Sequence, residues 1–183
     1  MRKLFYLLAL LPGLAMAAGS GGDTGTGTTA TPPKPTNTTK QCKGVRVWDE
    51  AKGRCVRPKN SSLDDDALMQ AVRELAHAGR IEDAQGVLRA MPDQGADLVL
   101  TYWGFTHRKL GQPALARAYY DRALAANPDN LLARSYLGQG HVETGEIPAA
   151  LAQWEEIRAR GGTGSWAELS LRQAIRTGVT YSY

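Results

Sequence analysis

The sequence predicts an all-α protein: a solenoid of about three helix–turn–helix repeats and a capping helix, preceded by a disordered linker and a small disulfide hairpin. Three observations predict this fold class. Small and apolar residues recur every 34 positions in the second half of the chain, a segment without large apolar residues comes earlier, and the two cysteines lie between them. We therefore expect segment boundaries at 1–17, 18–41, 42–61, 62–177 and 178–183.

The first segment has the pattern of a secretory signal peptide. Its basic start, Arg2-Lys3, is followed by an apolar run from Leu4 to Leu14 and then by small residues around a cleavage site after Ala17. The run is shorter than the roughly 20 residues that cross a bilayer. We expect a mature chain without a transmembrane segment in an exported location, periplasmic or secreted.

The second segment, residues 18–41, has the composition of a linker. Sixteen of its 24 residues are Gly, Thr or Pro, and it contains no aromatic and no large aliphatic residue. Such a chain buries too little surface to offset its conformational entropy. We expect this segment to be disordered.

The third segment, residues 42–61, is predicted to be a disulfide hairpin. Because export implies an oxidising compartment, Cys42 and Cys55 are expected to pair. Val45, Val47 and Trp48 favour extended chain, and the residues that follow them favour a turn. Two cysteines without a nearby histidine are a poor ligand set, so no metal is expected here.

The distribution of charge separates the hairpin from the rest and argues against nucleic-acid binding. Residues 42–61 contain six basic and two acidic residues, whereas residues 62–183 contain 12 basic and 15 acidic ones. Without Arg2 and Lys3 the whole chain carries only about +2. A nucleic-acid-binding domain usually has a much larger positive charge, so we expect no such partner.

The fourth segment repeats itself. Gly111 and Gly145 lie 34 residues apart, as do Ala116 and Ala150, and an earlier copy lies 32 residues upstream of the middle one. Each copy reads as an apolar-periodic helix, a turn with glycine and a second helix. A final helix after Ser165 begins with a capping-box pattern and ends at a glycine, which predicts a cap for the stack.

The repeat resembles the tetratricopeptide repeat. Residues 97–130 and 131–164 fit the family pattern best, and the unit at 65–96 is two residues short. Arg134 stands where the family usually has a large apolar residue. Small residues are expected to bring helices close together while aromatic residues fill the space between units. In the middle unit the matching residues are Leu100, Trp103, Gly104, Ala116, Tyr120, Ala123 and Pro128.

The resemblance implies a concave groove lined by the first helix of each unit, where a partner segment binds. We expect Phe105, with Arg108 and Lys109 one turn away, to hold a peptide with an acidic side chain. The alternative is that Phe105 covers the edge of the core and the basic residues are merely solvated. The family's groove positions fall here on Met69, Arg73, His77, Thr101, Phe105, Arg108, Lys109 and Gln139.

The chain shows no catalytic motif. A nucleophile elbow, a phosphate-binding loop and a metalloprotease motif are all missing from the sequence. His107 and His141 share one repeat position and are interpreted as packing residues, while His77 near a helix end is expected to favour the helix dipole. We expect no enzyme activity, no cofactor and no metal site.

These observations predict a non-enzymatic adaptor or scaffold of the cell envelope that binds another protein or peptide segment in its groove. Residues 42–56 also resemble a cysteine hairpin of chitin-binding modules, although the further disulfides of those modules are missing. One alternative is therefore a binder of cell-wall glycan or anionic envelope polymer through the hairpin. Another is a structural module that self-associates through its repeats. The identity of the partner does not follow from the fold.

Overall fold

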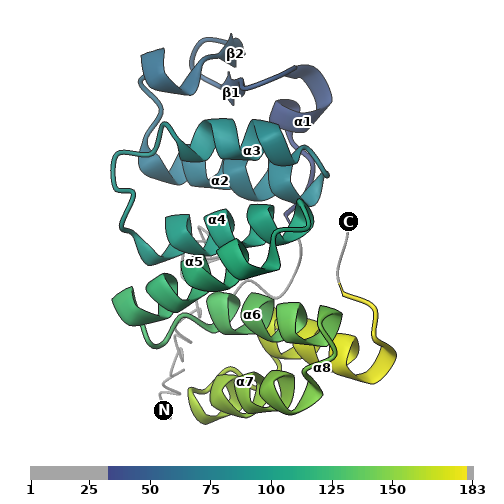
Figure 1. The fold of residues 1–183 in the computed structure, drawn as a ribbon. Coiled ribbons are helices and arrows are strands. Elements are labelled where there is room, and N and C mark those ends of the chain that lie inside the picture. The colour runs from purple at the N-terminus through teal and green to yellow at the C-terminus, as the bar shows by residue number, and fades with distance from the viewer. Residues whose placement is uncertain (1–32, 181–183) are drawn as a thin grey trace, which may run out of the picture.

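The computed structural model describes residues 33–180 of the 183-residue chain (Figure 1). The predicted signal peptide, residues 18–32 of the predicted linker and the last three residues lie outside this part. Three helix pairs pack in sequence, α2 with α3, α4 with α5 and α6 with α7, and α8 packs on α6 and α7. Figure 1 shows the pairs stacked from the hairpin end to the yellow helix α8, which confirms the predicted all-α repeat solenoid.

The helices of the stack match the predicted pairs in order and length. The shortest is α3, in the unit that the sequence showed to be two residues short. Their bounds are α2 (Asp65–His77), α3 (Ile81–Leu88), α4 (Asp97–Lys109), α5 (Pro113–Ala126), α6 (Leu131–Glu143), α7 (Ile147–Ala159) and α8 (Trp166–Thr177).

The predicted disulfide hairpin is confirmed. Strands β1 (Val47–Asp49) and β2 (Arg54–Val56) pair antiparallel, and Trp48 lies opposite Cys55. Cys42 and Cys55 form a disulfide, with their Cα atoms 5.6 Å apart. A short 3-10 helix, η1 (Pro58–Asn60), leads from the hairpin toward the repeats.

The last residues of the predicted linker are ordered in the structure. Residues 37–41 form helix α1 (Asn37–Gln41), which Thr36 caps by accepting a hydrogen bond from the Thr38 amide. The carboxylate of Glu74 in α2 accepts four hydrogen bonds of 2.5–3.1 Å from the amides and hydroxyls of Thr36 and Thr39. This tertiary acceptor orders a segment whose own composition favours disorder.

A second set of contacts docks the hairpin on the first repeat. The guanidinium of Arg80 donates to the carbonyl oxygens of Cys42, at 2.8 Å, and Gly44, at 3.0 Å. Val45 packs on Gly86 of α3 so closely that a Cβ there would lie 2.3 Å from the Val45 side chain. Hairpin and repeats therefore share an interface that has both polar and apolar contacts.

Small residues allow close helix packing within the stack, as the sequence predicted. A Cβ atom at Gly104 of α4 would lie 2.5 Å from the ring of Tyr120 in α5. A Cβ atom at Gly138 of α6 would lie 2.6 Å from Leu171 in α8. Because Tyr120 and Leu171 are both buried, each glycine makes room for a large core side chain.

The two equivalent histidines join the helices of their own pairs. His107 Nδ1 lies 2.7 Å from the side-chain oxygen of Gln112, and His141 Nδ1 lies 2.5 Å from the carboxylate of Glu146. In both pairs the bonded residue is the N-cap of the second helix. The histidine at this repeat position thus connects the first helix to the N-cap of the second helix in both pairs.

The helix ends agree with the sequence except at one point. Asp64 caps α2, and Gly178 adopts the left-handed conformation, with φ 71°, just past α8. Ser165 caps α8 by accepting from the Glu168 amide at 3.3 Å. Glu168 does not reach back as a capping box requires, because its carboxylate accepts instead from the Trp154 indole at 2.7 Å.

Candidate partner-binding surfaces

The predicted groove residues lie on α2, α4 and α6, the first helices of the three pairs. These helices lie next to one another, since α4 contacts both α2 and α6 (Figure 1). The structure therefore assembles one continuous face from the three helices, as the repeat pattern requires. Most of the predicted groove residues on this face are buried, whereas the residues that line an open groove would be exposed.

The centre of this face is a buried aromatic cluster. The Phe105 ring lies 4.8 Å from the Tyr136 ring and 5.2 Å from the His77 ring, measured between centroids, and Tyr102 completes the group. The exposed fraction of Phe105 is only 2%. In the structure Phe105 is thus a core residue that connects the three helices.

The expectation that His77 favours the helix dipole as a cation is wrong. Burial, and then the charges of Arg73, Lys109 and Arg108, lower the pKa of His77 to about 4. Its imidazole is therefore neutral at pH 7, and its Nε2 atom lies 3.2 Å from the hydroxyl of Tyr136. The residue connects α2 to α6 by packing and hydrogen bonding.

Arg108 is buried in an ion pair, whereas Lys109 is only half-buried. Arg108 Nη1 donates to the Glu143 carboxylate at 2.5 Å, and its guanidinium lies 5.6 Å from the centre of the Phe105 ring. Lys109 Nζ also lies 5.6 Å from that ring. Burial, and then the charge of Arg108, lower the pKa of Lys109 to about 8, so the residue remains mostly cationic at pH 7.

The other predicted groove residues are likewise either buried or half-buried. Thr101 and Gln139 are fully buried, and Met69 is part of the core. Thr101 donates to the Asp97 carbonyl at 2.7 Å, and Gln139 donates to Ser135 at 3.3 Å. Arg73 is half-buried at the surface of α2. Of the eight predicted residues, Arg73 and Lys109 are therefore the two that retain substantial exposure.

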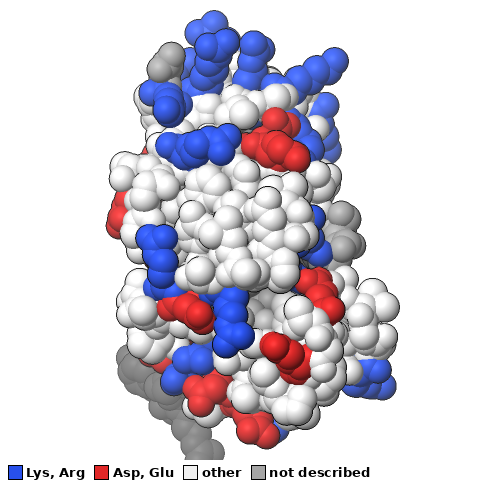
Figure 2. Space-filling view, in the orientation of Figure 1, with Lys and Arg blue, Asp and Glu red and all other residues white. Residues whose placement is uncertain are grey.

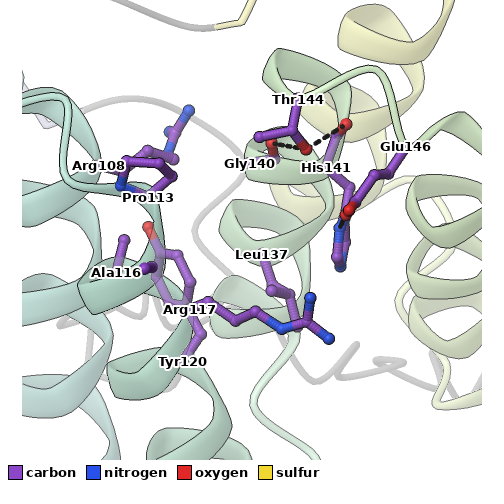
Figure 3. A pocket seen from close by; sticks show the side chains of 11 residues that line it. Arg108, Pro113, Ala116, Arg117, Tyr120, Leu137, Gly140, His141, Thr144 and Glu146 are labelled. Carbon is purple, nitrogen blue, oxygen red and sulfur yellow. Dashed lines mark hydrogen bonds and ion pairs between the residues drawn. The ribbon is translucent and has the colours of Figure 1, made fainter.

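A pocket of about 260 Å³ lies between the second and third helix pairs (Figure 3). Its walls include Pro113 and Tyr120 of α5 and Leu137 of α6, and Arg108 and His141 also line it. The Tyr120 hydroxyl points toward Arg108 (Figure 3), and burial raises the pKa of Tyr120 to about 12. Sequence reasoning missed this pocket because its walls come from different repeats.

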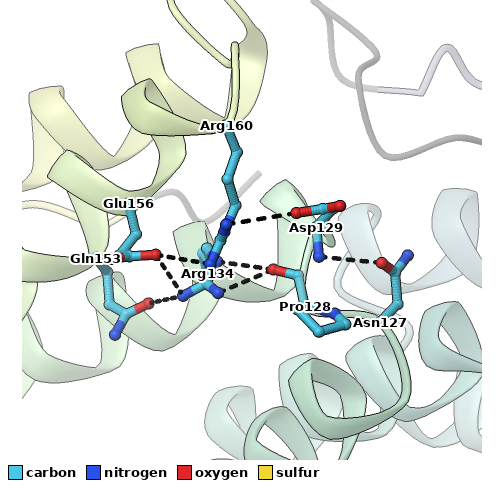
Figure 4. A network of polar contacts seen from close by, with 7 residues as sticks. All are labelled: Asn127, Pro128, Asp129, Arg134, Gln153, Glu156 and Arg160. Atoms are coloured by element: carbon cyan, nitrogen blue, oxygen red, sulfur yellow. Dashed lines mark hydrogen bonds and ion pairs between the residues drawn. The ribbon is translucent and has the colours of Figure 1, made fainter.

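Arg134 has a structural role that explains its departure from the family pattern. Its guanidinium donates to the carbonyl of Pro128 at 2.8 Å and to the side chain of Gln153 at 3.3 Å (Figure 4). Arg160 extends the network by pairing with Glu156 at 2.9 Å. These contacts connect the loop after α5 to α7, where an apolar residue would provide packing alone.

Basic side chains gather at the hairpin end of the molecule, at the top of Figure 2. There the hairpin segment and the end of α3 enclose a hollow of about 760 Å³, lined by several Lys and Arg side chains. Acidic and basic side chains alternate over the lower part of the same view. The charge separation read from the sequence is therefore also a separation in space.

Residues 33–180 show neither a cluster of metal ligands nor a membrane-spanning helix. They contain no group of three or more His, Cys, Asp or Glu side chains placed to hold a metal ion. None of the helices in this part of the chain has the length and apolar character needed to cross a bilayer.

Comparison with known proteins agrees with the fold. A family model for the tetratricopeptide repeat matches residues 98–130, which correspond to α4 and α5. Neither the curated proteins nor the solved structures give a significant match. Residues 98–130 therefore match a tetratricopeptide repeat, and the helix pairs on either side of them stack in the way that such repeats do. Repeats of this class generally mediate interactions between proteins and typically act as non-enzymatic scaffolds.

Proposed function

We propose that the protein is a non-enzymatic adaptor of the cell envelope that binds a segment of another protein on the face formed by α2, α4 and α6. The class of repeat supports an interaction role, and the signal-peptide pattern of residues 1–17 supports export. We propose both the location in the cell envelope and the binding of a segment of another protein.

One observation carries the choice of this face: Lys109 remains cationic although it is half-buried beside aromatic rings. Removal from water lowers its pKa to about 8, so the charged form is held at a cost. The charge of Glu143 already favours the charged form, and a carboxylate on a partner segment would stabilise it further. Arg73 on α2 adds a second positive charge to the same face, as its effect on the neighbouring His77 shows.

The partner segment expected from this chemistry carries an acidic side chain. It does not insert into the aromatic cluster, because Phe105 and Tyr102 are already buried. Instead it lies along the edge of that cluster, where Lys109 is reachable. Such a contact depends more on charge complementarity than on a deep apolar pocket, and is expected to weaken with salt.

The test is a capture experiment with three baits made from the oxidised chain. One is the wild type, one carries Arg73→Glu and Lys109→Glu, and the control carries Arg117→Glu and Arg122→Glu on α5. The control makes the same change in charge at exposed positions on a different helix. Phe105 and Arg108 are unsuitable as targets because both are buried and their replacement would disturb the fold.

The proposal expects envelope proteins that the wild type and control capture and that the Arg73→Glu/Lys109→Glu bait loses. Binding of the captured protein is then measured by calorimetry with purified components. Equal capture by all three baits would refute the assignment of this face, and capture of no protein by any bait would refute the adaptor function.

A further inference from the structure

The hollow between the hairpin segment and α3 contains an unusual concentration of positive charge. Five basic side chains line it: Lys43, Arg46, Arg57, Lys59 and Arg89. All five residues are exposed, and no acidic residue contributes to the lining. We call this feature the basic hollow.

Within residues 33–180, none of these five side chains forms an ion pair with an acidic side chain. The ion pairs found among residues 33–180 involve other cations, such as Lys52 with Asp49 and Arg80 with Asp83. Five like charges around one hollow repel one another and create a local positive potential. An anionic ligand would remove this repulsion, whereas a neutral ligand would not.

The fold brings the backbone positions of the five basic residues together around the hollow. Four come from the hairpin segment and the fifth, Arg89, follows α3. The disulfide, the Arg80 contacts and the packing of Val45 on Gly86 dock the hairpin against α3. Because the segments that carry the cations are already docked, a ligand need not supply the free energy of bringing those segments together.

The chemistry of the lining selects among anionic ligands. No aromatic side chain lines the hollow, so bases and neutral sugars have no ring to stack on. The resemblance to chitin-binding hairpins thus gains no support from this cavity. A protein partner usually buries an apolar centre with few charged residues, and a flat bilayer does not enter a hollow.

We propose that the basic hollow binds a segment of an anionic polysaccharide, a chain whose sugars carry carboxylate or sulfate groups. Arginine forks bind such groups through two parallel hydrogen bonds, and lysines add unoriented charge. A cavity of about 760 Å³ is large enough for a short oligosaccharide. This site is independent of the repeat face and would give the protein a second attachment point.

The experiment measures binding of oligogalacturonate and of a heparin oligosaccharide to the oxidised full chain by calorimetry, in about 0.15 M salt. The test variant is Arg46→Glu/Arg57→Glu, and the control is Arg117→Glu/Arg122→Glu. Both variants change the net charge equally, and all four positions are exposed. A neutral maltooligosaccharide, a poly-glutamate peptide and anionic phospholipid vesicles are measured in parallel.

We expect the test variant to bind either anionic oligosaccharide at least about tenfold more weakly than the wild type, with the control within about twofold. Loss of two cationic contacts should also make the affinity less dependent on salt concentration. Preference for the carboxylate or the sulfate oligosaccharide identifies the anionic group. The neutral sugar should not bind.

Three results would overturn the proposal. Equal weakening in the test variant and the control would show an effect of net charge rather than a site. Tighter binding to poly-glutamate or to vesicles than to either oligosaccharide would assign the hollow to a protein or to a membrane. Absence of binding to both oligosaccharides would reject it outright. The Arg73→Glu/Lys109→Glu variant should bind oligosaccharide normally, so the two proposals fail separately.

Discussion

The carboxylate of Glu74 is predicted to hold α1 on the first repeat, and its removal should release that helix. Four hydrogen bonds converge on it, and Glu74 itself is only 3% exposed. Glu74→Ala removes the acceptor of two backbone amides and two hydroxyls. Hydrogen bonds to a charged group contribute about 1.5–3 kcal/mol each but are not additive, so we expect a loss of about 3 kcal/mol in docking free energy.

Hydrogen exchange provides the assay for this loss. The amides of Lys40 and Cys42 bond within α1 to the carbonyls of Thr36 and Thr38, at 3.1 and 3.3 Å. In Glu74→Ala these amides should exchange faster by roughly 150-fold, the factor equivalent to about 3 kcal/mol. Global unfolding should change less, because the disulfide still joins the hairpin to this segment.

Two further variants make the Glu74 prediction specific. Glu74→Gln keeps the oxygen that accepts three of the four bonds but loses the negative charge and the oxygen that accepts from the Thr36 hydroxyl, so its exchange rates should lie between those of the wild type and Glu74→Ala. Glu82→Ala on α3 removes an exposed acid and should leave the rates unchanged. Unaltered exchange at Lys40 and Cys42 in Glu74→Ala would refute the reasoning.

Two other predictions concern the core of the stack. Burial, followed by neighbouring cations, lowers the pKa of His77 from 6.5 to about 4, so the unfolded chain binds a proton that the native chain does not. As the pH falls from 6.5 to 4, the free energy of unfolding should decrease by up to about 3 kcal/mol. Denaturant titrations at several pH values should show this dependence on pH in the wild type and not in His77→Gln. An equal dependence in both proteins would contradict the burial argument. Gly104→Ala places a Cβ 2.5 Å from the ring of Tyr120, whereas Gly140→Ala places one 3.6 Å from its nearest neighbour. Both gain helix propensity, so Gly104→Ala should be less stable than Gly140→Ala by about 1–3 kcal/mol, and equal melting temperatures would exclude the steric account.

The repeat architecture could be predicted because its causes are local and recur along the chain. Gly104 and Gly138 occupy equivalent positions, and both make room for large side chains of other helices. The disulfide could be predicted from the expected export and from the lack of other cysteines in the sequence. Helix ends such as Ser165 and Gly178 depend on neighbours within a few residues, so their patterns are visible in the sequence.

The candidate site followed the sequence only in part. The family register placed Phe105 and Arg108 on the correct helices and on a shared face. It did not show that Phe105 packs against rings from α2 and α6, or that Arg108 pairs with Glu143. Exposure depends on what every neighbouring helix places nearby, and a repeat pattern read from one sequence does not contain that information.

Helix pairing, the disulfide and the excess of positive charge in residues 42–61 were determined by the sequence itself, because each depends on local composition or on spacing along the chain. Tertiary structure alone decided that Glu74 orders α1 and that Arg89 joins four hairpin cations around one hollow. These arrangements bring together residues that are 30 or more positions apart. Their energies arise from hydrogen bonds and Coulomb interactions that exist only after the helices and the hairpin have packed.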